Sequence, residues 1–207
     1  MEITEIFYSL QGEGVEIGLP TIFVRTSGCN LKCTWCDTRY AWEEGQEMDV
    51  EEIIEIIRDF ECNRVCVTGG EPLLQEETLE LIENLLEDYM VTIETNGSID
   101  ISPLIDKDLM ISMDYKTPSS KMSDKMIESN LQTLRDKDQL KFIVSDKRDY
   151  NFALDVLEKH EIKADIIYQP EGNKNMRKLA EWILDDSLDV RLIPQLQKII
   201  WGGKRGV

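Results

Sequence analysis

The stretch RVCVTGGEPLLQEETLELIENLLEDYMVTIET, residues 64–95, contains the pattern that determines the fold. It begins with a short run rich in β-branched residues, continues through apolar side chains at helical spacing, and ends with a second β-branched run. A strand, a helix and a strand in this order form one unit of a parallel sheet. The stretch therefore predicts parallel strands joined by covering helices.

The same alternation extends over the chain from Pro20 onward. The predicted strands are residues 21–26, 64–69, 90–95, 109–114, 140–145, 164–169 and 190–195. Helical segments separate them, including one that we expect Ser123 to cap. About six or seven strands are fewer than the eight of a closed barrel. We therefore expect an α/β fold, a partial (open) TIM-type barrel of about six parallel strands with outer helices.

The composition is that of a folded protein. Of the 207 residues, 42% are apolar and 31% are charged. No repeat or flexible linker divides the chain, so we expect residues 1–207 to form a single domain. A net charge of −18 disfavours partners with phosphate backbones and anionic membranes. Because the sequence shows no membrane span or secretory signal, we expect no membrane or nucleic-acid partner and a cytoplasmic location.

Three cysteines crowd into the loop GCNLKCTWCDT, residues 28–38. The spacing of Cys29, Cys33 and Cys36 curls three sulfurs toward one point, so they can share a small cluster. A 4Fe-4S cluster normally takes four thiolates, and three leave one iron open for chemistry. The alternatives are three unconnected core cysteines or a zinc site, but no Cys or His pair with zinc spacing follows. Cys62 and Cys66 are expected to pack as small apolar side chains.

This triplet, with the aromatic Trp35 before its last cysteine, resembles the signature of the radical S-adenosylmethionine superfamily. The resemblance implies that the open iron chelates S-adenosylmethionine and that one electron releases a 5′-deoxyadenosyl radical. It also implies cofactor contacts from the GGE stretch and from a later strand end. The implied cofactor-binding residues are Trp35, Asp37, Gly69, Gly70, Glu71, Ser112, Asp114 and Lys116. No catalytic side chain is expected beyond the cluster and cofactor, since His160 is the single histidine.

Two longer segments indicate a particular family within this superfamily. EIFYSLQGEG (5–14) and GLPTIFVRTSGCNLKCTWCDTRYAW (18–42) resemble the 7-carboxy-7-deazaguanine synthase family, as do TGGEP (68–72) and RLIPQLQK (191–198). The family converts 6-carboxy-5,6,7,8-tetrahydropterin to 7-carboxy-7-deazaguanine with loss of ammonia, on the pathway to queuosine and archaeosine. The resemblance implies a 4Fe-4S cluster, S-adenosylmethionine and Mg²⁺ as cofactors. It further implies a homodimer and an electron donor such as flavodoxin or ferredoxin.

The family's binding residues carry over to two regions, the loops within residues 9–46 and the tail 195–207. The implied substrate-binding residues are Leu10, Gln11, Gly12, Glu13, Arg25, Thr68, Gln195 and Gln197. A planar guanidinium at Arg25 suits the substrate carboxylate, and Thr38 would be a hard oxygen ligand for magnesium. Where the family has Gln-x-His-Lys, this chain has an amide, Gln197, in place of the histidine expected to help hold the carboxylate.

Other interpretations fit parts of the pattern. An activating enzyme that abstracts hydrogen from a glycine of a partner protein would share the cluster and the GGE stretch, but would not require SLQGEG or Arg25. A non-catalytic iron–sulfur protein would need a fourth cluster ligand. Taken singly, residues 11–14 could form only a turn, Arg25 a surface ion pair, and Asp37 with Thr38 a helix cap.

Overall fold

The computed structural model describes all 207 residues and contains one nine-stranded sheet of order β3-β1-β2-β4-β5-β6-β7-β8-β9. Successive strands from β2 to β9 pair in parallel. They are β2 (Pro20–Thr26), β4 (Arg64–Gly69), β5 (Met90–Thr95), β6 (Met110–Asp114), β7 (Gln139–Val144), β8 (Asp165–Pro170) and β9 (Arg191–Leu192). Since the outermost strands β3 and β9 do not pair, the barrel is open. The predicted fold is confirmed.

Two strands at the start of the sheet were not predicted. β1 (Glu2–Leu10) and β3 (Gln46–Glu47) are antiparallel additions, with β1 lying between β2 and β3. Most β1 side chains are half-buried rather than alternately buried and exposed, so the strand lacks a clear period of two. By pairing with β2, β1 brings residues 11–19 to the mouth of the barrel.

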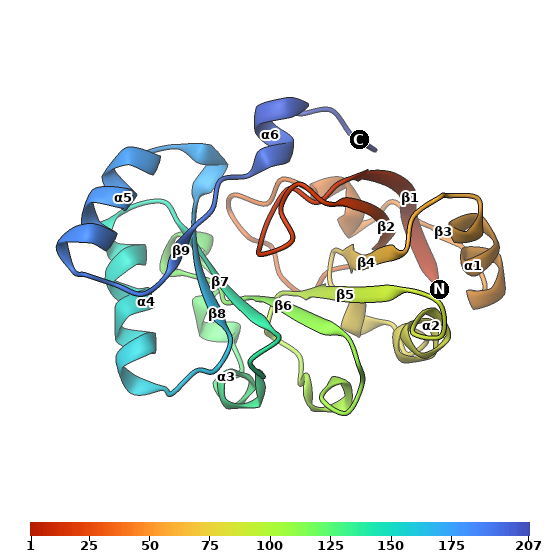
Figure 1. Cartoon of the computed structure of the whole chain (residues 1–207), viewed down its shortest axis with the longest axis horizontal. Helices are drawn as coiled ribbons and strands as arrows, with labels where there is room; N and C mark the ends of the chain where they lie inside the picture. Colours follow the sequence, from red (N-terminus) through yellow and green to blue (C-terminus); the bar gives the residue numbers. More distant parts are fainter.

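The helices lie outside the sheet (Figure 1). α1 (Val50–Arg58), α2 (Thr78–Leu85), α3 (Ser129–Thr133), α4 (Lys147–Lys159) and α5 (Met176–Asp185) follow its right, lower and left sides in the figure. α6 (Leu196–Ile200) and the C-terminus lie above the open side. None of these helices combines the length and the apolar character that crossing a membrane requires.

The helix predicted to start at Ser123 is shorter than expected. Residues Ser123–Lys125 form a single 3-10 turn with no side-chain cap, and the α-helix begins only at Ser129. Met126 between them has an extended backbone. Its sulfur accepts a hydrogen bond from the Lys116 N–H at 3.2 Å, while Ile127 N–H donates to Gly97 O at 3.1 Å. These contacts to strand-end loops interrupt the helical path.

Strand periodicity separates the core from the inner face of the barrel. In β4, Val65 and Val67 belong to the buried cluster under the helices, whereas Cys66 and Thr68 point to the opposite side. The other parallel strands follow the same rule. The inward polar residues near their carboxyl ends are Arg25, Thr68, Glu94, Asp114, Lys141 and Gln169. The sheet therefore presents polar side chains from six neighbouring strands to one interior space.

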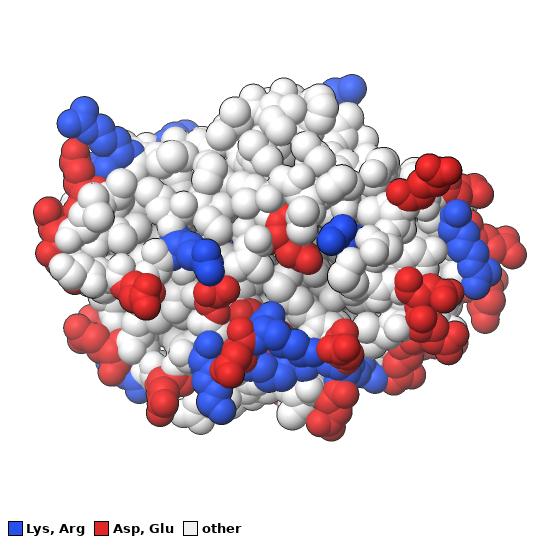
Figure 2. Space-filling view, in the orientation of Figure 1, with Lys and Arg blue, Asp and Glu red and all other residues white.

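Acidic side chains gather at the right-hand end of the face in Figure 2, over α1 and α2. Charged side chains are sparse in the upper middle, around α6. Three apolar side chains at the end of this helix are exposed, namely Ile199, Ile200 and Trp201. We call these three residues the α6 patch.

Candidate active site

A cavity of about 310 Å³ lies at the carboxyl ends of the parallel strands. Nearly all of the predicted site residues line it. They are Leu10, Gln11, Gly12, Glu13, Arg25, Cys29, Cys33, Trp35, Cys36, Asp37, Thr38, Thr68, Gly69, Gly70, Asp114, Lys116, Gln195 and Gln197. Of the predicted set, only Glu71 and Ser112 are not part of the wall. The fold thus joins residues that lie far apart in the sequence.

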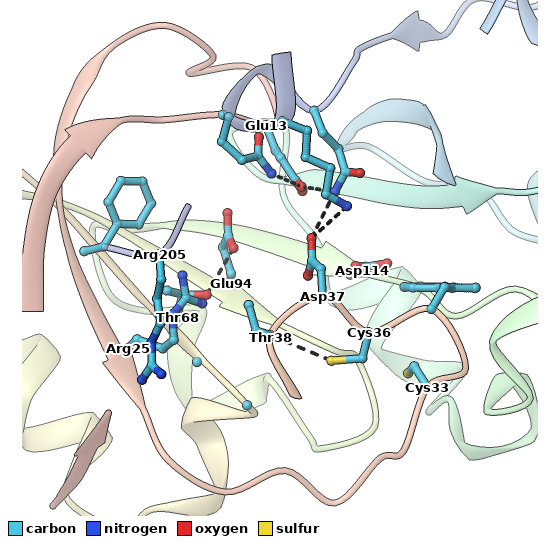
Figure 3. Close-up of a pocket in the computed structure, with 18 of the residues that line it drawn as sticks. Glu13, Arg25, Cys33, Cys36, Asp37, Thr38, Thr68, Glu94, Asp114 and Arg205 are labelled. Atoms are coloured by element: carbon cyan, nitrogen blue, oxygen red, sulfur yellow. Dashed lines mark hydrogen bonds and ion pairs between the residues drawn. The ribbon is translucent and has the colours of Figure 1, made fainter. Parts of the chain in front are cut away.

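The cavity has two ends (Figure 3). We call one the cysteine end, formed by Cys29, Cys33, Cys36, Trp35, Asp114 and Lys116. We call the other the arginine end, formed by Glu5, Arg25, Tyr40, Thr68, Glu94 and Arg205. Asp37 and Thr38 lie between the two groups, with Glu13 above them in the figure. A ligand that fills the cavity would touch both ends.

All three loop cysteines are free thiols at the cysteine end. No three His, Cys, Asp or Glu side chains lie close enough together to hold a single metal ion. A multi-iron cluster spaces its ligands more widely, so three thiols around one end of the cavity fit such a cluster better. Burial raises the pKa of the Cys33 thiol to about 11, although the Lys116 ammonium opposes this. A bound metal overrides such a shift, because a coordinating thiol is deprotonated.

The GGE stretch supports the cysteine loop from behind. Gly70 N–H donates to Thr26 O at 3.1 Å, and Glu71 N–H donates to Gly28 O at 2.8 Å. A Cβ on Gly70 would overlap the Gly28 carbonyl oxygen. The missing side chain therefore allows the two backbone segments to approach closely.

The Glu71 side chain, predicted to contact the cofactor, does not line the cavity. Its carboxylate is fully buried and accepts hydrogen bonds from Thr95 Oγ1 at 2.8 Å and from Asn96 N at 2.6 Å. It also accepts one from Leu73 N at 3.2 Å. Both oxygens are thus used within the protein, and Glu71 joins the loop after β4 to the end of β5.

Ser112 also lies outside the cavity wall. It is fully buried, and its Oγ accepts a hydrogen bond from Gln139 Nε2 at 2.7 Å. Ser112 points to the same side of β6 as Asp114 but two residues earlier, so it lies one layer deeper in the barrel. Gln139 covers it.

Several buried polar atoms in the cavity wall have no protein partner. They are Trp35 Nε1, Asp114 Oδ1 and both amide atoms of Gln169. The other Asp114 oxygen binds Lys116 Nζ at 2.9 Å, and this ammonium lies 5.1 Å from the centre of the Trp35 ring. Because buried polar groups almost always have partners, these atoms are available to hydrogen-bond a ligand or ordered water in the cavity.

Glu13 is the centre of a buried network. Its carboxylate binds Lys141 Nζ at 2.8 Å and accepts from the side-chain amides of Gln195 at 2.8 Å and Gln197 at 3.0 Å. Burial would raise the pKa of Glu13, but the Lys141 ammonium and these amides hold it well below its usual range. Sequence reasoning missed Lys141. The available signal was a charged residue inside the apolar run of β7, residues 140–144, since buried charges need partners.

The same network fixes the orientation of the Gln197 side-chain amide. Its Nε2 is held by Glu13, which leaves Oε1 buried without a partner against Gly12. Glu13 as a carboxylate accepts only, so the amide nitrogen must face it. Gln197 therefore offers no charge in place of the histidine that the resemblance implies, and one N–H of its amide is already used by Glu13.

The arginine end contains an ion pair. Arg25 Nε binds Glu5 Oε1 at 2.8 Å, and Tyr40 Oη donates to the same oxygen at 2.8 Å. Thr68 Oγ1 donates to Glu94 Oε2 at 3.1 Å. Burial opposes the charge of Arg25, but Tyr40 and Glu5 raise its pKa above the ordinary value. The guanidinium is thus a permanent cation in the wall rather than part of a surface ion pair.

Thr38 and Asp37 offer oxygens between the two ends. Thr38 precedes the 3-10 turn Arg39–Trp42 but makes no capping hydrogen bond. Its hydroxyl makes one weak side-chain contact, with the Cys36 sulfur at 3.7 Å. Asp37 Oδ2 binds Lys198 Nζ at 3.0 Å. Magnesium takes one or two protein oxygens and completes its shell with water and substrate, so this donor set fits it.

Comparison with known proteins defines the class. The Radical SAM superfamily profile matches residues 23–182. The crystal structure of QueE from Escherichia coli has a TM-score of 0.79 and 24% identity, covering 94% of this chain and 93% of that chain. The crystal structure of Streptococcus suis SuiB has a TM-score of 0.59 and 14% identity, covering 83% of this chain and 48% of that chain. Fold and site are those of a radical S-adenosylmethionine protein, whose cofactors are a 4Fe-4S cluster and S-adenosylmethionine.

Relatives of similar length identify the family within this superfamily. The protein of Thermoplasma acidophilum is 40% identical over 209 residues and covers 100% of both chains. That of Koribacter versatilis is 38% identical with 97% coverage of each, and that of Methanospirillum hungatei is 41% identical, covering 97% of this chain and 85% of its own. All three are named 7-carboxy-7-deazaguanine synthase. The chain belongs to the 7-carboxy-7-deazaguanine synthase family.

Proposed function

We propose that this protein converts 6-carboxy-5,6,7,8-tetrahydropterin to 7-carboxy-7-deazaguanine and ammonia, in the biosynthesis of deazapurine nucleosides such as queuosine or archaeosine. The product and ammonia together contain all atoms of the substrate. The reaction therefore consumes no net oxidant, which agrees with S-adenosylmethionine being regenerated. The bound cluster and S-adenosylmethionine supply the 5′-deoxyadenosyl radical.

One observation carries this proposal: three free thiols and a half-buried arginine occupy opposite ends of a single cavity. Arg25 binds the substrate carboxylate, since only its Nε is used by Glu5 and a guanidinium has five N–H groups. Thr68 and Glu94 face the heterocycle from neighbouring strands. Residues 10–13 cover it from the β1–β2 loop.

The cofactor lies at the cysteine end in this proposal. Asp114 and Lys116 contact its ribose and carboxylate, and Trp35 packs beside the cluster. Gly69 and Gly70 admit its methionine portion by close backbone approach. Glu71 and Ser112 act from behind, as positioning groups. Thr38 provides one magnesium oxygen, with Asp37 nearby.

The proposed function also includes an oligomeric state, an electron donor and a cellular compartment. The whole chain acts as one domain and forms a homodimer, for which the exposed α6 patch is a suitable apolar surface. An electron donor such as flavodoxin or ferredoxin reduces the cluster. Five free cysteines favour a reducing, cytoplasmic compartment. A small cavity partly closed by the C-terminal tail suits a pterin better than the glycine loop of a partner protein.

The test is an anaerobic assay. Reconstituted protein should hold about four irons and, with reductant, magnesium and S-adenosylmethionine, release the deazaguanine acid and ammonia in equal amounts. Cleavage of S-adenosylmethionine without this product would point to another substrate. Failure to bind a cluster would refute the radical chemistry altogether.

A further inference from the structure

The C-terminal tail forms part of the cavity wall. Residues 202–207, which follow α6, all line the cavity. A Cβ added at Gly202 or Gly203 would touch nothing within 4 Å, so neither glycine is packed against the body of the protein. Arg205 is the residue whose side chain attaches this tail to the arginine end.

The Arg205 side chain lies beside Arg25 (Figure 3). Its guanidinium stacks on Tyr40 at 3.7 Å from the ring centre, and its Nη1 binds Glu44 at 2.8 Å. Its Nε is 3.6 Å from Glu5 Oε2, while Arg25 Nε binds the other Glu5 oxygen at 2.8 Å. Glu5 thus aligns two guanidinium groups side by side, and both retain N–H groups without a protein acceptor.

Charge balance requires a second cation at this end. The charge of Arg25 is already offset by Glu5, and Glu94 adds a further carboxylate nearby. Another carboxylate entering this space would meet no net positive charge from Arg25 alone. Gln197 cannot supply one, because an amide is neutral and its nitrogen is held by Glu13. Glu44, the second partner of Arg205, is 58% exposed and Arg205 is 43% exposed, so water weakens this pair and leaves the guanidinium able to bind a second carboxylate.

We propose that Arg205 is a second carboxylate-binding and specificity-determining residue, which supplies the cation that Gln197 cannot and holds the tail over the bound substrate. This inference rests on the proposed function, because it concerns the carboxylate of that substrate. Arg25 binds from the wall of the barrel and Arg205 from the tail. The tail opens for entry and closes when the carboxylate joins the two guanidinium groups.

Arg205→Gln tests this proposal, with Arg177→Gln on the exposed face of α5 as a matched control. We expect Arg205→Gln to raise KM for the carboxytetrahydropterin about 10- to 100-fold, the loss of one charged hydrogen-bonded contact, with a smaller change in kcat. Arg205→Lys should recover part of the loss by restoring the charge. The Arg177→Gln control should keep the wild-type KM and the basal cleavage of S-adenosylmethionine.

A binding measurement on the reconstituted protein separates this inference from the proposed function. Wild-type protein should bind 6-carboxypterin more tightly than pterin, and Arg205→Gln should lose most of this preference. If wild type turns over the substrate but Arg205→Gln keeps its KM and its preference, only the role of Arg205 is refuted. If wild type forms no deazaguanine product, the proposed function fails instead.

Discussion

The absence of a side chain at Gly70 determines where the cysteine loop lies. We expect Gly70→Ala to push the Gly28 carbonyl outward at a cost of about 1–3 kcal/mol, as overpacking commonly does, and to reduce the iron bound per chain. Gly203→Ala is the control, because a Cβ there has open space. Equal iron contents in the two variants would show that close approach at Gly70 does not matter.

The buried pair Glu13–Lys141 makes a second prediction at the residue scale. Lys141→Met leaves the Glu13 carboxylate buried without its cation and should lower the free energy of unfolding by about 3–5 kcal/mol. Arg177→Ala, which breaks an exposed pair with Glu181, should change it by less than about 1 kcal/mol. Urea unfolding measures both changes. A similar small loss in each variant would contradict the importance of the buried pair.

The pair also predicts a pH dependence. Folding lowers the pKa of Glu13 from 4.5 and raises that of Lys141 from 10.5. The stability that the pair contributes is therefore present between these values, and is lost as the pH falls below 4.5 or rises above 10.5. The difference in unfolding free energy between wild type and Lys141→Met should shrink when the pH is lowered from about 6 to about 3. A constant difference would contradict this assignment.

Thr38 is the proposed magnesium ligand, and its hydroxyl can be removed by mutation. Thr38→Ala removes a hydroxyl that makes no capping bond, so stability should hardly change. The magnesium concentration for half-maximal activity should rise about tenfold or more. Even residues that only hydrogen-bond to a metal ligand commonly change metal affinity by that factor. An unchanged magnesium dependence would remove Thr38 from the metal site.

At the scale of elements, Glu71 links the ends of β4 and β5. In Glu71→Gln one acceptor becomes a donor and faces the backbone N–H of either Leu73 or Asn96, which should cost about 1–3 kcal/mol of unfolding free energy even without cofactor. Denaturation of the cofactor-free protein measures this loss. Unchanged stability with weakened binding of S-adenosylmethionine would instead restore the direct contact that the sequence suggested.

The elements also show what sequence can predict. The βα alternation correctly gave the parallel strands, because each strand alternates a core face and a barrel face. β1 escaped prediction because its side chains are mostly half-buried. Position near a strand end does not reveal whether a side chain lines the cavity or is used within the protein, as Glu71 and Ser112 are. Lys141 and Arg205 were missed because their partners, Glu13 and Glu5, are distant in sequence.

At the scale of the molecule, the open barrel places two chemical functions in one cavity. The cysteine loop forms one end, and Arg25, Glu5 and the tail form the other. The strand ends between them hold these groups at fixed positions, and in the proposed function the radical forms at the first end while the substrate carboxylate binds at the second. This division predicts that the two functions can be separated by mutation.

The most direct measurement quantifies 5′-deoxyadenosine and 7-carboxy-7-deazaguanine together, in wild type and in Arg25→Gln, under anoxic conditions with carboxytetrahydropterin. We expect wild type to form the deazaguanine with little 5′-deoxyadenosine. Arg25→Gln should lose product formation by about 100-fold, equivalent to one strong charged contact, yet still cleave S-adenosylmethionine. Full product formation by Arg25→Gln, or none by wild type, would contradict the account.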